Sequence, residues 1–307
     1  MLVIIDNFII KIEFAMVTRF FAIATLSILT VFAGCTSKPN TSTKPTVVVS
    51  ILPLKYFVEK IADSTLQVKV LVPPGSSPEM YEPTPNQLVE FSQSDIYFSI
   101  GLLDFEKGLE PKLKDGYKTK YINLSNGANL IEGSCTHGDE HEGHNHNHGI
   151  DPHIWASTVE GKHIAKVMLD NLIEVYPSHK ERFTANYTKF IAEIDSLDVE
   201  IRSIITNSGV KAFLIYHPAL GYFARDFGVM QMSIEEEGKS PSAKGMLNVI
   251  NKSKELGIKS VLSQSQFDTH NSQAIAMEID GAVVKVDPLA ENWAQSMVQI
   301  ANAIAGK

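Results

Sequence analysis

The sequence predicts an α/β protein of two lobes, each a mainly parallel sheet with flanking helices, joined by a single long helix. Apolar runs rich in β-branched residues alternate with amphipathic segments in the first half of the chain, and the same alternation restarts after Gly209. One uninterrupted helical pattern lies between the two halves. Alternating strands and helices are typical of a parallel sheet that is covered on both faces.

In the first half, a strand is predicted at residues 47–52, where the run is apolar and β-branched. Pro53 then precedes an amphipathic segment, which predicts a helix. Thr84 followed by Pro85 is typical of a helix N-cap with proline at the first helical position. Three further strands are predicted at residues 66–72, 95–100 and 121–124.

The long helix is predicted at residues 178–208. Ser178 and Glu181 have the spacing of a capping box, and neither glycine nor proline follows until Gly209. About thirty residues at 1.5 Å each make a helix roughly 45 Å long. Such a helix can cross from one domain to the other, or it can be an ordinary core helix within one domain. Apolar residues recur along the predicted helix at spacings of three and four, at Phe183, Tyr187, Phe190, Ile194, Leu197, Ile201 and Ile204.

The second half repeats the alternation of strands and helices. Gly228 and Gly257 follow two amphipathic segments directly, which is typical of helix C-termini. The predicted strands are residues 213–216, 229–234, 260–263 and 283–286, and the predicted helices are residues 219–227, 243–256, 271–279 and a terminal one from Glu291. This half is therefore predicted to form a second α/β lobe at residues 209–307, after a first lobe at residues 46–177.

The N-terminal region indicates export and lipidation. Residues 20–32 are almost wholly apolar, follow Arg19 and precede Ala33-Gly34-Cys35, which is typical of a bacterial signal peptide with a lipoprotein processing site. We therefore expect residues 1–34 to be the signal peptide and residues 35–45 a flexible tether on a lipidated Cys35. A plain secretory signal followed by a buried cysteine is the alternative. Translation starts at Met1 or, because residues 1–15 suit no usual signal, at Met16.

Charge and cysteine content restrict the partners. The formal net charge is −8, which argues against nucleic acid, because phosphate binding requires a basic face. Contact with the membrane is expected through the lipid on Cys35 rather than through a basic surface. If Cys35 carries lipid, Cys135 has no partner for a disulfide and is an inert thiol or a soft metal ligand.

Histidine is concentrated in one tract. Six of the ten histidines fall within seventeen residues, and acidic side chains are interleaved with them. Imidazole is the commonest protein ligand for zinc and its neighbours, so the tract predicts metal binding by a flexible loop at residues 135–149. The alternative is an exposed polar loop without a ligand. The histidines of the tract are His137, His141, His144, His146 and His148, and His153 follows them.

Two polar residues follow predicted strands of the second half directly. They are His217 and Asp287, and each precedes a proline. Ligands of parallel α/β domains bind beyond the carboxyl ends of the strands, so these side chains, expected on adjacent strand ends, are candidate ligands. A hydrogen-bonded core histidine and an ordinary turn are the structural alternatives. The first half supplies Glu79 and His153 as further candidates.

Four motifs occur in order: PPGSSPEMYEPTP, DPHIW, YHPALGYFARDFG and KVDPL. With this order and spacing, the chain resembles the solute-binding proteins of bacterial zinc and manganese ABC transporters over almost its whole exported length. The resemblance implies two α/β lobes joined by a long rigid helix, with a metal ion in the cleft between them. It also implies that His153, His217 and Asp287 are metal ligands, and that a histidine-rich loop accompanies zinc selectivity.

The first motif departs from the family pattern, because Glu79 stands where members usually have histidine. Glutamate can bind zinc, so the implied site contains two imidazoles and two carboxylates. The added oxygen makes Mn(II) or Fe(II) an alternative cargo. Glu82 is expected to cap the next helix and Gln264 to line the cleft. The isolated histidines His163, His179 and His270 are expected to be structural or exposed to solvent.

The predicted function is therefore capture of Zn(II) in the cleft and delivery to the membrane permease of an ABC transporter. We expect a monomer in the cell envelope, on the outer face of the cytoplasmic membrane or in the periplasm. Four protein ligands fill the coordination sphere of zinc, whereas a catalytic zinc keeps one position open, so we do not expect an enzyme. A surface adhesin with the same fold is the alternative from another class.

Overall fold

The computed structural model describes residues 44–307 apart from 117, 134–148, 236–238 and 268. These residues belong to one unit of the chain, Lys44–Lys307. The predicted signal peptide, Cys35, Cys135 and the five histidines of the tract lie outside the described residues. No helix in the described part of the chain is long and apolar enough to cross a membrane.

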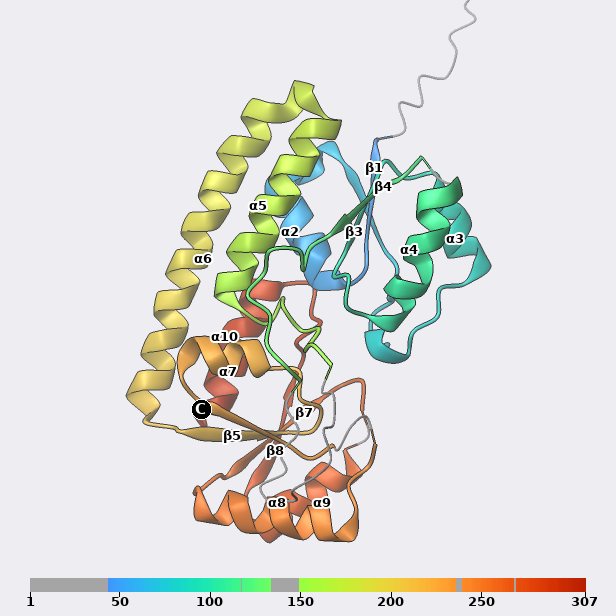
Figure 1. The fold of residues 1–307 in the computed structure, drawn as a ribbon. Coiled ribbons are helices and arrows are strands. Elements are labelled where there is room, and N and C mark those ends of the chain that lie inside the picture. The colour runs from blue at the N-terminus through green and yellow to red at the C-terminus, as the bar shows by residue number, and fades with distance from the viewer. Residues whose placement is uncertain (1–43, 117, 134–148, 236–238, 268) are drawn as a thin grey trace, which may run out of the picture. The chain divides into compact units, whose positions relative to one another are not determined.

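Two sheets, each of four parallel strands, form the framework (Figure 1). The first has the order β2-β1-β3-β4, and the second has the order β6-β5-β7-β8. This arrangement, with helices around each sheet, confirms the predicted fold class. The strands of the first sheet are β1 (Thr46–Val49), β2 (Gln67–Val70), β3 (Ile96–Ser99) and β4 (Lys120–Asn123). Those of the second are β5 (Ala212–Ile215), β6 (Met230–Ser233), β7 (Ser260–Gln264) and β8 (Ala282–Val286).

Capping residues set the beginnings of several helices around the first sheet. Thr84 caps α3 as predicted, and it forms a capping box with Gln87. The helices α4 and α5 occupy stretches where the sequence predicted no element. The elements of this half are α2 (Leu52–Ala62), α3 (Pro85–Ser92), α4 (Asp104–Gly116) and α5 (Thr158–Val175), with short 3-10 turns η1 (Asp63–Thr65), η2 (Pro78–Met80) and η3 (Pro177–His179).

The long helix is α6 (Lys180–Ser208), and Gly209 ends it in the left-handed conformation that glycine adopts without strain. The predicted capping box is wrong. Ser178 lies inside η3, which runs directly into α6, so His179 is the N-cap and its side chain makes no capping hydrogen bond. The helix packs against α2 and α5 of the first lobe and against α7 and α10 of the second (Figure 1). It therefore spans both lobes and contributes to their core.

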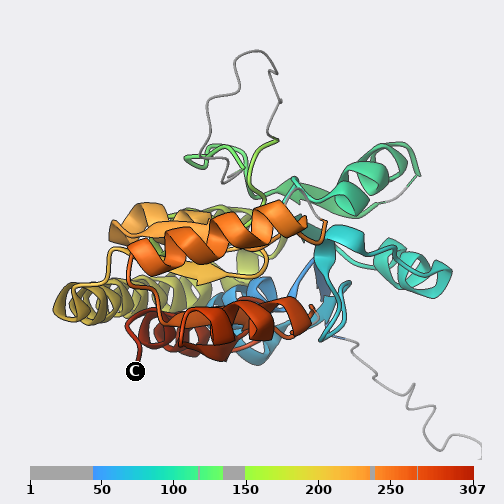
Figure 2. The ribbon, with the colours of Figure 1, turned by 90° about the horizontal axis from the view of Figure 1, so that it is seen from below.

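The second sheet is covered on both faces, as the two views together show (Figure 2). Successive residues of β5 alternate between two apolar clusters, because neighbouring side chains of a strand point to opposite faces. Phe213 and Ile215 belong to the cluster that continues into the first lobe, whereas Ala212 and Leu214 belong to a separate cluster. The helices of this half are α7 (Gly221–Phe227), α8 (Ala243–Glu255), α9 (His270–Glu278) and α10 (Trp293–Ile304).

Candidate metal site

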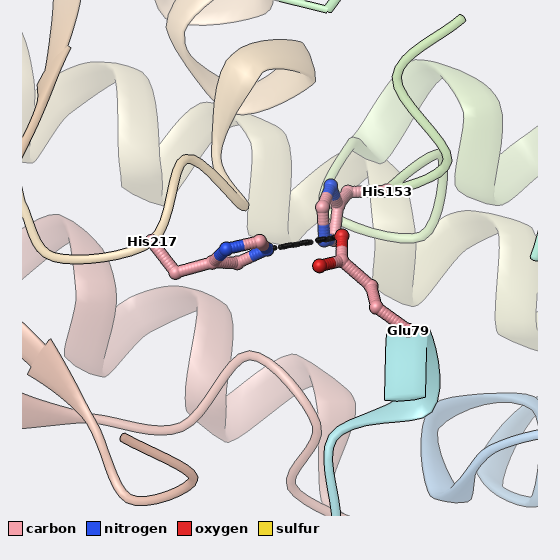
Figure 3. Close-up of side chains that lie close together, drawn as sticks. All are labelled: Glu79, His153 and His217. Atoms are coloured by element: carbon pink, nitrogen blue, oxygen red, sulfur yellow. Dashed lines mark hydrogen bonds and ion pairs between the residues drawn. The ribbon is translucent and has the colours of Figure 1, made fainter. Parts of the chain in front are cut away.

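The side chains of Glu79, His153 and His217 converge on one point (Figure 3). Within the described part of the chain, each offers a ligand atom, and these atoms all lie within 4.8 Å of one another. The Nε2 atoms of the two imidazoles are 3.3 Å apart. Oε1 of Glu79 lies 3.1 Å from Nε2 of His217 and 3.6 Å from Nε2 of His153. Oε1 of Glu79 and the Nε2 atoms of the two histidines thus face a common centre.

Glu79 comes from the first lobe. It lies in η2, which begins at Pro78 in the connection between β2 and α3. Its side chain is 33% exposed, and the next residue, Met80, is 87% exposed. Glu79 therefore approaches the histidines from an exposed turn.

His153 lies in the buried segment that leads into α5. Asp151 fixes this segment, because its Oδ1 accepts hydrogen bonds from the His153 backbone N at 2.8 Å and contacts Nδ1 of the ring at 2.8 Å. The residues two positions before and two positions after His153 contact the second lobe. Tyr222 donates its hydroxyl proton to the backbone oxygen of Asp151 at 2.8 Å, and Trp155 Nε1 donates to the oxygen of Pro288 at 3.0 Å. His153 is therefore anchored to both lobes.

His217 follows β5, two residues beyond its last strand residue. Gln264 on β7 holds the His217 backbone, since its Oε1 accepts from the backbone N at 3.3 Å and its Nε2 donates to the backbone O at 2.7 Å. The imidazole stacks on Phe267, with ring centroids 4.9 Å apart. Its Nδ1 lies 3.1 Å from Oε2 of Glu235. The backbone and the ring of His217 are thus each held by a buried side chain, Gln264 for the backbone and Glu235 for the ring.

The electrostatics of the site couple these groups. Burial alone lowers the pKa of His217, but hydrogen bonds and charges from Glu235 and Glu79 outweigh it and raise the pKa to about 9. Burial raises the pKa of Glu79, yet the hydrogen bond and charge of His217 and the charge of His153 outweigh this effect, so its pKa lies below the usual value. The pocket therefore presents a carboxylate beside an imidazole that holds its proton strongly.

Asp287 stands outside this group of three. Its Oδ1 accepts hydrogen bonds from the backbone N of Leu289 at 3.0 Å and from Nε2 of Gln266 at 3.2 Å. The expectation that His217 and Asp287 follow adjacent strands is wrong, because β7 lies between β5 and β8. Two strand spacings amount to about 10 Å, so the strands that precede His217 and Asp287 lie about this far apart.

The other polar residues have identifiable surroundings. Glu82 does not cap α3, because Thr84 and Gln87 form the cap. Gln264 lines the pocket as predicted. His163 contacts the oxygen of Leu124 through Nε2 at 3.2 Å, and His179 stacks on Phe183, which agrees with structural roles.

Sequence reasoning missed Asp151 and Glu235. Glu235 lies two residues beyond β6, and a polar residue after a strand is the same signal that identified His217 and Asp287. Asp151 stands two residues before His153 in Asp-Pro-His, and its side chain closes a turn on the His153 backbone.

Buried imidazole nitrogens and a carboxylate oxygen that face one centre are typical of a zinc site. Comparison with known proteins identifies the family. A family model described as zinc-uptake complex component A, periplasmic (ZnuA) matches residues 47–306. The chain belongs to this family. The resemblance carried by the four sequence motifs is thus confirmed, and so is the predicted class of function, a metal-binding protein for zinc uptake.

Individual members of the ZnuA family resemble the chain over most of its length. The high-affinity zinc uptake system protein ZnuA of Bacillus subtilis is 27% identical over 249 residues, which are 78% of this chain and 76% of that protein. The zinc-binding lipoprotein AdcA of Streptococcus pneumoniae is 28% identical over 269 residues, which cover 83% of this chain but only 52% of AdcA. A crystal structure of ZnuA superimposes with a TM-score of 0.77 at 35% identity and covers 85% of this chain and 98% of that one.

Proposed function

We propose that this chain captures Zn(II) with Glu79, His153, His217 and Asp287 and delivers it to the membrane permease of an ABC transporter. The observation that carries the proposal is the convergence of two buried imidazole nitrogens and one carboxylate oxygen within 4.8 Å. These donors come from both lobes, as expected of a protein that encloses its cargo. Asp287 supplies a fourth donor from the carboxyl end of β8, at the same sheet edge as His217.

Zinc is the favoured cargo because the family and the relatives AdcA and ZnuA are named for zinc. The donor set itself is more permissive. Two imidazoles suit zinc, whereas carboxylate oxygens also suit Mn(II) and Fe(II). The histidine tract, His137 to His148, is proposed as an auxiliary collector of metal rather than a part of the tight site.

The remaining parts of the proposal concern location and class. We propose that Cys35 carries lipid and anchors a monomer to the outer face of the cytoplasmic membrane or within the periplasm. The name of AdcA, a lipoprotein of the same family, supports the anchor. We propose no catalytic activity, because four protein ligands would fill the coordination sphere that a catalytic zinc must leave partly open.

The test combines metal analysis with growth. Protein purified without added metal is titrated with Zn(II) and Mn(II) against a chelator, and tight binding of one zinc per chain is expected. A deletion strain is then grown under zinc limitation and under manganese limitation. A growth defect that only zinc repairs supports the proposal. A defect that only manganese repairs changes the cargo, and normal growth with reduced surface adhesion would favour the adhesin.

A further inference from the structure

Each candidate histidine ligand has its second ring nitrogen on a buried carboxylate. Nδ1 of His153 lies 2.8 Å from Oδ1 of Asp151, and Nδ1 of His217 lies 3.1 Å from Oε2 of Glu235. Asp151 is 5% exposed and Glu235 is 7% exposed. The two carboxylates come from separate segments, one before α5 and one after β6, so the arrangement arises twice in one site.

The chemistry of imidazole gives this arrangement a direction. A neutral imidazole has one N–H donor and one nitrogen lone pair, and an ionised carboxylate can only accept. A carboxylate at Nδ1 therefore places the proton on Nδ1 and leaves the lone pair on Nε2. The Nε2 atoms of His153 and His217 are the ones that face each other and Glu79 (Figure 3).

We infer that Asp151 and Glu235 are positioning residues, which hold His153 and His217 in the tautomer and orientation that present Nε2 to the metal. The inference rests on the proposed function, since it assigns how that same site is held. Neither residue touches the metal in this account. Partners of this kind orient ligands in metal sites generally, and their loss costs about 10- to 100-fold in affinity.

Asp151 is itself held in place. Its Oδ1 also accepts from the His153 backbone, and its own backbone oxygen accepts from the hydroxyl of Tyr222. Its other oxygen lies against Gly221 at the start of α7, where an added Cβ would be 2.5 Å from Oδ2. The carboxylate thus has little freedom to turn away from His153.

Glu235 is held through its backbone. Its backbone N donates to the oxygen of Tyr216, the residue before His217, at 3.0 Å. Its backbone oxygen accepts from the hydroxyl of Ser233 at 3.2 Å. The carboxylate and the imidazole that it contacts are therefore carried by two chain segments that are bonded to each other.

The test uses Glu235→Gln and Asp151→Asn, which keep shape but remove the charge and the strict acceptor character of the carboxylate. We expect each to weaken zinc binding by about tenfold or more, with one zinc still bound per chain. Glu174→Gln near the end of α5 is the matched control, because it makes the same change at a carboxylate that is 71% exposed and pairs with Lys120 rather than with a histidine. Its zinc affinity should stay at the wild-type value, since this carboxylate does not position a candidate ligand.

A second readout separates positioning from loss of folding. In zinc-bound protein labelled with ¹⁵N-histidine, the Nδ1 proton of His217 should shift upfield in Glu235→Gln while that of His153 stays in place, and Asp151→Asn should do the reverse. Unchanged affinity and unchanged resonances in both variants would overturn the inference while wild-type binding upholds the proposed function. An equal loss in Glu174→Gln would overturn it as well. A wild-type protein without tight zinc binding overturns both.

Discussion

The two sides of the candidate site differ in how firmly they are held. On one side, His153 and His217 are 5% and 7% exposed, and each ring nitrogen that faces away from the centre meets a buried carboxylate. On the other side, Glu79 lies on a 3-10 turn with its side chain 33% exposed. The histidines are thus fixed by buried partners, whereas the Glu79 side chain is less buried, so we expect it to lose more side-chain entropy on binding a metal.

This difference suggests that affinity and metal preference depend on different residues of the site. We expect the preorganised imidazoles to provide most of the affinity, because little ordering opposes their binding. We expect the half-buried carboxylate of Glu79 to adjust to the ion and so to influence which metal is preferred. The following variants test that division, beginning with the side that should matter most.

The largest effect is expected from the histidines. His153→Ala and His217→Ala should each weaken zinc binding by more than about a hundredfold, or about 3 kcal/mol, because each removes a preorganised donor. Competition titration against a chelator measures the loss. His179→Ala serves as control, since His179 stacks on Phe183 at the start of α6 and should leave binding unchanged. Wild-type affinity in His217→Ala would refute the assignment.

The pH dependence of zinc affinity also tests His217. The pKa of His217 is raised to about 9, so zinc must displace a proton from it at neutral pH. Affinity should therefore rise by up to about tenfold per pH unit from pH 6.5 towards 9 and then level off. The protonated imidazole also stabilises the chain prepared without metal at pH below about 6.5, and this contribution is lost as the pH rises through about 9. Affinity that is flat above pH 7 would contradict the raised pKa.

A smaller effect is expected from Glu79. Glu79→Ala should weaken zinc binding by about tenfold, or about 1.4 kcal/mol, because water replaces one adjustable donor. Glu79→His should raise the preference for zinc over manganese, since it adds an imidazole to the set. Parallel titrations of both variants with the two metals measure this. Equal affinity and equal selectivity in all three proteins would mean that Glu79 does not bind the metal.

A substitution at Gly221 tests how strongly zinc affinity depends on the position of Asp151, and it leaves all four proposed ligands unchanged. Gly221→Ala places a Cβ 2.5 Å from Oδ2 of Asp151 and 3.1 Å from Cδ1 of Ile131, so the carboxylate that contacts His153 must shift. We expect a loss of zinc affinity of about threefold to tenfold. This is less than the loss of about 10- to 100-fold that follows removal of such a carboxylate, because here the carboxylate is displaced and not removed. Gly108→Ala in α4 is the control, because its added Cβ meets no atom within 4 Å. Titration of the two variants should separate them.

The smallest effect on tight binding is expected from the histidine tract. Deletion of residues 136–148 should leave one tight zinc per chain and remove only weak additional equivalents, because the three donors that converge at the site lie outside the deleted residues. Calorimetric titration distinguishes the two classes of binding. Loss of the tight equivalent would make the tract a source of ligands for the site itself.

Local sequence patterns predicted the positions of the strands and of the long helix. Each strand of both sheets was expected close to where it lies, and the α6 helix was expected to within two residues at its start. Residues that follow strands, such as His217, stood out because the carboxyl end of a parallel strand is where ligands bind. Side-chain periodicity and helix-breaking residues are local properties, so they can be observed without the fold.

Which of these residues lie close together depends on the order of the strands and on long-range packing. The order β6-β5-β7-β8 inserts a strand between His217 and Asp287, and no local pattern reports the order of strands in a sheet. The partners of His217 are equally distant in the chain, because Glu235 is 18 residues away and Gln264 is 47. Such contacts depend on how chain segments pack in space, which is why His217 could be predicted from sequence while its pairing with Glu235 and Gln264 could not.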